Sequence, residues 1–121
     1  MGRTHRVVVV DGSALLRDAL SIRLEGVDDL TVVAHTHDGP EALSLAAEHL
    51  PDVIVVDEAV WDAHQPEAMR ELHRVSPTTR VVVMSHDGST RVASAGPHGA
   101  VSKQSPFDEF VAELRRVLGP R

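Results

Sequence analysis

The sequence predicts an α/β fold of the (βα)5 type, with a doubly wound parallel sheet that carries helices on both faces. Short apolar runs rich in Val and Ile recur along the 121 residues, and helical patterns of apolar residues separate them. Continuous runs of this kind are typical of strands that are buried on both faces of a parallel sheet. The alternation of strands and helices favours parallel strands joined by crossovers, and the length fits one domain with a single core.

The expected strands are short, and most are β-branched. They are Val7–Val10, Leu30–Ala34, Val53–Val56, Val81–Met84 and the weaker run Gly99–Ser102. Aromatic residues are scarce, so the core between these strands and the helices should be built from aliphatic side chains.

Two helices are expected before the third strand. In the first, Leu recurs at every fourth position over residues 16–24, with Ser13 as the expected N-cap and Gly26 as the stop. The second begins around Pro40, which suits the first helical position, and it ends before Pro51.

The later helices are less uniform. A third is expected to begin at Pro66, and the Gly-rich residues 85–98 predict a short or disordered fourth helix. Before the last helix, Ser105 and Pro106 predict an N-cap and a first helical residue, and Asp108 a capping-box acid. The apolar stripe expected on this helix consists of Phe107, Phe110, Val111, Leu114, Val117 and Leu118.

The composition argues against several classes of protein. The net charge of −6 disfavours direct binding to nucleic acid, and the absence of Cys excludes disulfides and thiolate metal sites. No apolar run is long enough to span a bilayer, and no signal-peptide core follows the short polar N-terminus. We therefore expect a cytoplasmic domain that does not contact membranes.

Four polar residues follow or end the expected strands: Asp11, Asp57, Ser85 and Lys103. Functional groups gather at the carboxyl ends of strands in open α/β sheets. Together these residues favour phosphoryl transfer to a carboxylate, with Asp57 as nucleophile, a neighbouring acid on Mg²⁺, and Ser85 and Lys103 on the phosphoryl oxygens. The alternative is a vestigial site, because an Asp after a strand often only caps a helix or forms a turn.

Four stretches carry a resemblance that spans nearly the whole chain. In order, they are RVVVVDGSALLRDAL, HLPDVIVVD, RVVVMS and GAVSK. The chain resembles a CheY-like (flavodoxin-like) response-regulator receiver domain, in particular the receivers of NarL/FixJ-type transcriptional regulators. This resemblance implies the strand order 2-1-3-4-5 and a receiver domain over residues 1–121, with any DNA-binding output domain beyond this chain.

The resemblance also implies a role for each strand-end residue. Asp57 corresponds to the phosphoacceptor, and Ser85 and Lys103 to the side chains that contact its phosphoryl group. Mg²⁺ would be held by Asp11, by Asp57 and by the backbone carbonyl of Ala59. Because a receiver is itself the substrate of its phosphoryl transfer, we expect no catalytic residues in the usual sense and no enzyme.

Several departures make this chain an atypical member. Gly12 stands where the family has a second acid, so the Mg²⁺ site loses a carboxylate, and Ala100 stands at the position of the aromatic switch residue. The stretch before the fifth strand is also shorter than usual. Glu58 is a poor replacement for the lost acid, because adjacent strand residues point to opposite faces. With one acid fewer, Lys103 can pair directly with Asp57, which argues against Mg²⁺ as a firm cofactor.

These observations predict an atypical signal-input domain of a two-component-type regulator, with impaired or absent Mg²⁺-dependent phosphorylation. It would control the dimerisation or activity of a helix-turn-helix transcription factor. Two alternatives stay open: a conventional Asp-phosphorylated receiver, and a small-molecule-sensing pseudo-receiver with its cleft near Gly12.

The expected partners are a second copy or a related regulator, a histidine kinase, and DNA only through an output domain. We place the dimer surface at the first and last helices, where Arg115 and Arg116 lie on an exposed face. Trp61 is compatible with three positions: over the pocket, at a partner surface, or on a flexible loop.

Overall fold

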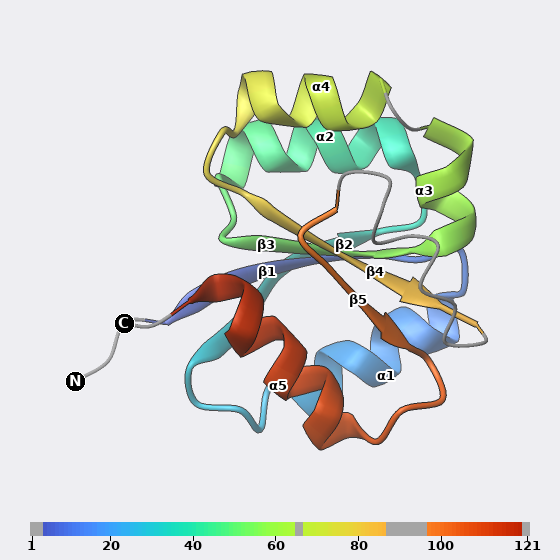
Figure 1. Cartoon of the computed structure of the whole chain (residues 1–121), viewed down its shortest axis with the longest axis vertical. Coiled ribbons are helices and arrows are strands. Elements are labelled where there is room, and N and C mark those ends of the chain that lie inside the picture. The colour runs from blue at the N-terminus through green and yellow to red at the C-terminus, as the bar shows by residue number, and fades with distance from the viewer. Residues whose placement is uncertain (1–3, 65–66, 87–96, 120–121) are drawn as a thin grey trace.

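The computed structural model describes residues 4–64, 67–86 and 97–119. Its five parallel strands lie in the order β2-β1-β3-β4-β5, as the family resemblance implies (Figure 1). The strands are β1 (His5–Val10), β2 (Leu30–Thr36), β3 (Val53–Asp57), β4 (Arg80–Ser85) and β5 (Gly99–Ser102). All five expected strands are confirmed, and the polar residues Asp57 and Ser85 prove to be the last residues of their strands.

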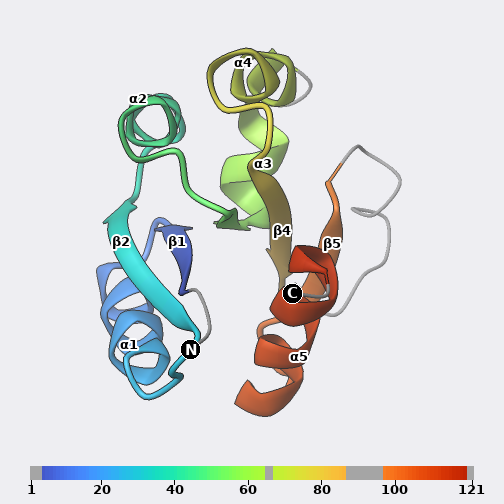
Figure 2. The same cartoon turned by 90° about the vertical axis from the view of Figure 1, so that its left-hand side faces the viewer.

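The helices form a layer on each side of the sheet (Figures 1 and 2). One layer holds α1 and α5, and the other holds α2, α3 and α4. Their bounds are α1 (Ala14–Leu24), α2 (Gly39–His49), α3 (Glu58–His64), α4 (Glu67–Val75) and α5 (Phe107–Leu118). In the described part of the chain, none of these helices is both long and apolar enough to traverse a bilayer.

The two faces of the sheet bury different side chains because successive strand residues point to opposite faces. Toward α1 and α5 the strands present Val7, Val9, Val53, Val55, Val82 and Met84. Toward the other helices they present Val8, Val10, Ile54, Val56, Val81 and Val83. The predicted stripe of α5 completes the first cluster, with Phe110, Val111 and Leu114 buried and the rest of the stripe partly buried. The core is therefore largely aliphatic, as expected.

The start of one helix follows the sequence signals, and the start of another does not. The hydroxyl of Ser13 accepts a hydrogen bond from the Leu16 N–H at 3.1 Å, so the predicted N-cap of α1 is confirmed. At α5 the prediction is wrong, because the N-cap is Pro106 and no side chain caps the helix. The helix begins only at Phe107, so Ser105 lies too far from its first turn, and Asp108 accepts from the neighbouring Glu109 N–H and not from the backbone before the helix.

The sequence signals miss helix α3, which residues 58–64 form directly after β3 and ahead of the helix predicted from Pro66. This helix places Trp61 in the apolar cluster between the sheet, α2 and α4, with 5% of its surface exposed. Burial of this large side chain explains why the segment is helical, and Trp61 occupies none of the three positions considered above. The predicted fourth helix falls mostly on residues 87–96, which lie outside the described residues.

The start of β5 is attached to β4 through His98. The Val81 N–H donates to Nδ1 of His98 at 2.9 Å, and the His98 N–H donates to the Val81 carbonyl at 2.8 Å. Only an unprotonated Nδ1 can accept this hydrogen bond. Burial lowers the pKa of His98, and the nearby Arg80 and His73 lower it further.

We expect acidification to weaken the fold through His98. Because its pKa is lowered in the folded state, its stabilising contribution is fully present above the ordinary His pKa of about 6.5 and is lost as the pH falls below that value. The free energy of unfolding should therefore drop more in the wild type than in His98→Asn, whose amide oxygen can still accept from Val81. Urea denaturation at neutral and mildly acidic pH measures this difference, and equal drops in both proteins would refute it.

Candidate functional site

The four strand-end residues meet at one edge of the sheet, as predicted. Asp11 directly follows β1, Asp57 ends β3, Ser85 ends β4, and Lys103 directly follows β5. Since these four strands are consecutive neighbours in the sheet, their carboxyl ends converge. Asp11, Asp57 and Ser85 are each at least 95% buried.

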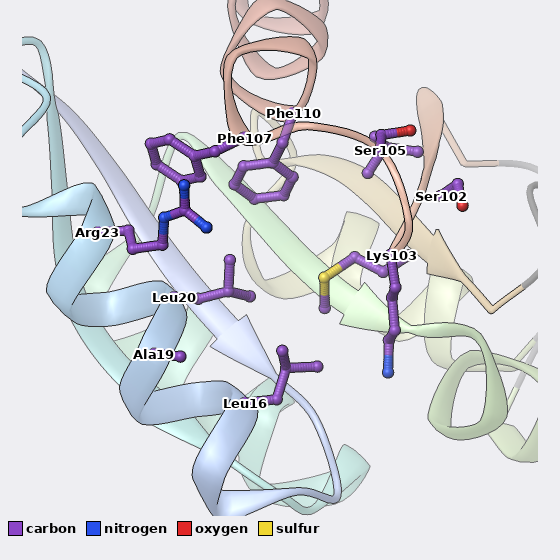
Figure 3. Close-up of a pocket in the computed structure, with 11 residues that line it drawn as sticks. Leu16, Ala19, Leu20, Arg23, Ser102, Lys103, Ser105, Phe107 and Phe110 are labelled. Carbon is purple, nitrogen blue, oxygen red and sulfur yellow. The ribbon is translucent and has the colours of Figure 1, made fainter.

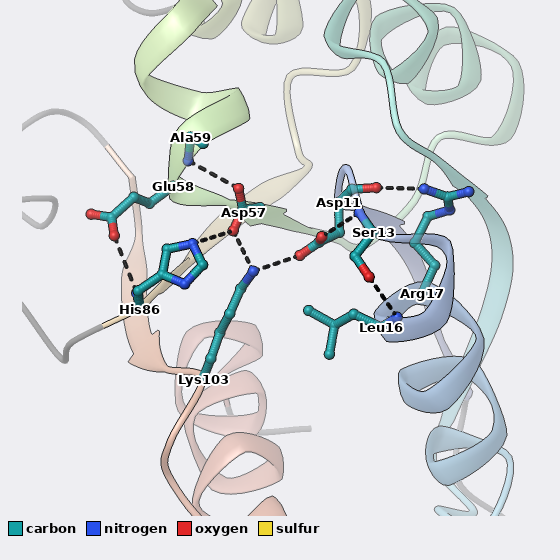
Figure 4. Close-up of polar contacts among 9 residues, drawn as sticks. All are labelled: Asp11, Ser13, Leu16, Arg17, Asp57, Glu58, Ala59, His86 and Lys103. Atoms are coloured by element: carbon teal, nitrogen blue, oxygen red, sulfur yellow. Dashed lines mark hydrogen bonds and ion pairs between the residues drawn. The ribbon is translucent and has the colours of Figure 1, made fainter.

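Lys103, the only lysine in the chain, bridges the two acids (Figure 4). Its Nζ lies 2.9 Å from Oδ2 of Asp11 and also forms an ion pair with Oδ1 of Asp57. Burial alone would lower the pKa of Lys103, but its hydrogen bonds to Asp57 and Asp11 outweigh burial and raise the pKa above its ordinary value. The ammonium therefore stays charged and neutralises much of the charge of the two carboxylates.

The remaining oxygens of the two acids are held by backbone groups (Figure 4). Oδ1 of Asp11 accepts from the Ser13 N–H at 2.8 Å, and Oδ2 of Asp57 accepts from the Ala59 N–H at 3.1 Å. Each carboxylate thus uses one oxygen to fix its own orientation and presents the other to Lys103. Arg17 supports this arrangement, because its Nη1 donates to the Asp11 carbonyl at 2.6 Å.

The hydroxyl of Ser85 has an unusual environment. It is buried, and in the part of the chain that the structure describes its Oγ has no hydrogen-bond partner. An unsatisfied buried hydroxyl is costly, so this atom has the capacity to take a further hydrogen-bond partner.

The sequence reasoning missed His86, which lies at the open side of the pocket. Its Nε2 is 3.7 Å from Oδ1 of Asp57, and its backbone N–H donates to Oε1 of Glu58 at 3.1 Å. The only sequence signal was its place directly after Ser85, at a strand end. Glu58 is thus engaged with the backbone of His86.

Gly12 is exposed at the rim of the pocket. A Cβ added there would meet nothing within 4 Å. Among the described residues, Gly119 is the glycine with a positive φ, and Gly12 does not have one. The backbone at Gly12 therefore does not require glycine. The missing carboxylate therefore leaves open space.

At the expected switch position, Ala100 is half-buried in β5, and its N–H donates to Glu113 at 3.3 Å.

Mg²⁺ takes oxygen ligands in near-octahedral geometry. The candidate ligands are Asp11, Asp57 and the Ala59 carbonyl, and Lys103 places an ammonium group against both carboxylates. Over residues 4–64, 67–86 and 97–119, no group of three or more His, Cys, Asp and Glu side chains is placed to hold a metal. As arranged, this set of residues does not fit Mg²⁺.

Comparison with known proteins extends this description. Residues 7–115 match the family described as "Response regulator receiver domain". The chain is 33% identical over 117 residues to "Response regulator GacA" of Pseudomonas aeruginosa, covering 93% of this chain and 55% of that protein. It therefore spans about half the length of that relative. Members of this family typically bind Mg²⁺ for phosphorylation.

Two solved structures have the same fold. The signal receiver domain of the putative response regulator NarL from Mycobacterium tuberculosis superposes with a TM-score of 0.82 at 28% identity, covering 99% of this chain and all of that one. A LuxR-family two-component response regulator from Aurantimonas gives a TM-score of 0.81 at 27% identity, covering 95% of this chain and 85% of that one.

The ion-pair geometry predicts the effect of removing Lys103. In Lys103→Met two buried carboxylates would face each other without a cation, so the free energy of unfolding near neutral pH should fall by about 3 kcal/mol. Adding Asp57→Asn removes one of the two charges and should recover a large part of this loss. Urea denaturation followed by the fluorescence of the single Trp measures both variants. If the second substitution brought no recovery, the two carboxylates would not be coupled through Lys103.

Proposed function

This chain belongs to the response-regulator receiver-domain family, and from this premise we propose that it is an atypical signal-input domain with impaired or absent Mg²⁺-dependent phosphorylation. One observation carries the proposal: the ammonium of Lys103 lies against both Asp11 and Asp57, where a conventional pocket would need a divalent cation. The absence of a carboxylate at Gly12 supports the same conclusion.

The chemistry of phosphoryl transfer explains the impairment. Oδ1 of Asp57 would attack the phosphorus of a donor, and the bond to the leaving group would break as the acyl phosphate forms. The acyl phosphate carries nearly two negative charges where the free carboxylate carries one, and it lies beside the buried Asp11. Among the described residues of the pocket, Lys103 is the one cation that contacts both acids. Without a metal ion, it alone would have to offset the added charge from that position. The product is therefore poorly stabilised.

A second candidate function is a conventional receiver that is phosphorylated on Asp57. The buried Ser85 hydroxyl favours it, because it lacks a partner among the described residues and lies at the edge where a phosphoryl group would bind. On this alternative, Ser85 and Lys103 would both contact phosphoryl oxygens, and Lys103 would leave Asp11 to do so.

The wider role follows the family. We propose that the domain regulates a transcription factor in the cytoplasm, receives its signal from a histidine kinase or another partner, and reaches DNA only through an output domain. Because the chain spans about half of the curated relative, the activity of a whole protein is part of this proposal. We propose that the chain itself is not an enzyme.

We further propose that the domain forms dimers through the layer that contains α1 and α5. Leu15 and Ile22 lie on one side of α1, two helical turns apart, and are 82% and 67% exposed. Exposed apolar side chains on one helix face suit an interface between copies. Arg115 and Arg116, also on this layer, are engaged in ion pairs with Asp29 and Glu113, so reversing their charge would break these pairs as well.

Restoring the missing acid tests the phosphorylation proposal. Incubation with Mg²⁺ and acetyl phosphate, followed by intact mass spectrometry, should give little adduct in the wild type. In Gly12→Asp the rate of adduct formation should rise at least about tenfold, because the new carboxylate has open space and completes an acidic site. Gly12→Asn is the matched control without charge and should stay close to the wild type.

Asp57→Asn in the Gly12→Asp protein identifies the modified residue, since the adduct should disappear. A wild type that is phosphorylated on Asp57 as fast as Gly12→Asp would overturn the proposal and establish the conventional receiver in its place.

The dimer proposal has its own test. Replacing both Leu15 and Ile22 by Glu should shift the protein toward monomer in sedimentation velocity experiments, because it places charges at the centre of an apolar contact. Leu50→Glu is the matched control, since Leu50 is 59% exposed and lies at the end of α2 in the other layer. Equal sedimentation of all three proteins would exclude this surface.

A further inference from the structure

A second cavity lies away from the acids, between α1 and the segment that joins β5 to α5 (Figure 3). Its volume is about 130 Å³. Its apolar wall includes Leu16 and Leu20 from α1, Met84 from β4 and Phe110 from α5. Asp11 and Asp57 do not line it.

The size of the cavity suits a small ring. An apolar protein cavity of about 150 Å³ holds one benzene molecule. The present cavity therefore has room for one six-membered ring or a chain of similar bulk, provided that polar substituents project toward solvent.

The charged residues that line the cavity are all basic. The whole chain has 18 acidic and 12 basic residues, yet the cavity is lined by Arg23 and Lys103 and by no acid. The guanidinium carbon of Arg23 lies 4.4 Å from the centroid of the Phe107 ring, at one end of the cavity. Within the described residues no carboxylate pairs with Arg23. An Arg held over an aromatic ring in this way is ready to bind a carboxylate.

We propose that this cavity binds a small apolar carboxylate of about the size of benzoate. The ring or short chain packs against Leu20, Met84 and Phe110, and the carboxylate pairs with Arg23 at the rim. Apolar walls with a few placed polar groups are the usual composition of small-molecule sites.

This site would be coupled to the acidic pocket through one side chain. The stem of Lys103 lines the cavity while its Nζ pairs with Asp11 and Asp57 (Figures 3 and 4). A ligand in the cavity would therefore contact the residue that pairs with both acids. The inference goes beyond the proposed function, since binding at Arg23 requires no phosphorylation of Asp57, and either proposal can fail alone.

The test is a ¹H–¹⁵N NMR titration of the 121-residue chain with three probes of similar shape: benzoate, benzyl alcohol and benzylamine. We expect saturable shifts for benzoate at the amides of Ala19, Leu20 and Phe110, with a dissociation constant on the order of 1 mM. Benzyl alcohol should bind at least about fivefold more weakly, and benzylamine should not bind, because Arg23 repels it.

Variants separate the ring from the carboxylate. Arg23→Gln should weaken benzoate binding at least about fivefold and leave benzyl alcohol unchanged. Arg70→Gln removes an equally charged, exposed side chain on α4 and should change neither probe. Ala19→Trp should block both probes by filling the cavity mouth from an exposed position.

Several results would overturn the inference. They are the absence of saturable benzoate shifts, equal affinity for the three probes, shifts centred away from α1 and α5, or unchanged benzoate affinity in Arg23→Gln. Failure of benzoate to bind, together with concentration-dependent shifts at Ala19 and Leu20 in the free protein, would assign the cavity to a second copy of the chain instead.

Discussion

The candidate site depends on one ammonium group that is held between two buried carboxylates. Asp11 and Asp57 come at the ends of the neighbouring strands β1 and β3, and the parallel pairing of these strands places the two residues side by side. Two such charges cannot remain buried together without a cation. In this chain the cation is a side chain of the protein, the ammonium of Lys103, which directly follows the edge strand β5. The charge of the site is therefore largely offset by the fold itself, and its state depends on where β5 and the following segment lie.

That dependence extends through the rest of β5. The strand is only four residues long and pairs with β4 alone, so side-chain contacts at its start and along α5 help to hold it. His98 bonds to the backbone of β4, and Glu113 accepts from the backbone of Ala100. Gly99 permits the close approach of α5, since a Cβ there would lie 2.5 Å from the Glu113 carboxylate and 2.7 Å from Val117. These contacts set the position of Lys103.

Much of this arrangement was predictable from the sequence, because strong local signals and the topology agreed. The apolar runs located all five strands, Ser13 located the start of α1, and the parallel order brought Asp11, Asp57, Ser85 and Lys103 to one edge. The roles of these residues remain proposals. The errors have a tertiary origin. Residues 58–64 are helical because burial of Trp61 outweighs weak local signals, and the approach of His86 to Asp57 depends on the path of the chain after β4, which its place at a strand end does not specify.

The junction between β3 and α3 has a mechanical consequence. Asp57 is the last residue of the strand, Glu58 is the first of the helix, and Oδ2 of Asp57 accepts from the Ala59 N–H. The same carboxylate therefore faces the pocket and closes the first turn of α3, with no loop between them to absorb movement. Any change in the charge or covalent state of Asp57 would act directly on this turn. The pocket and the buried Trp61 are thus joined by α3 without an intervening loop.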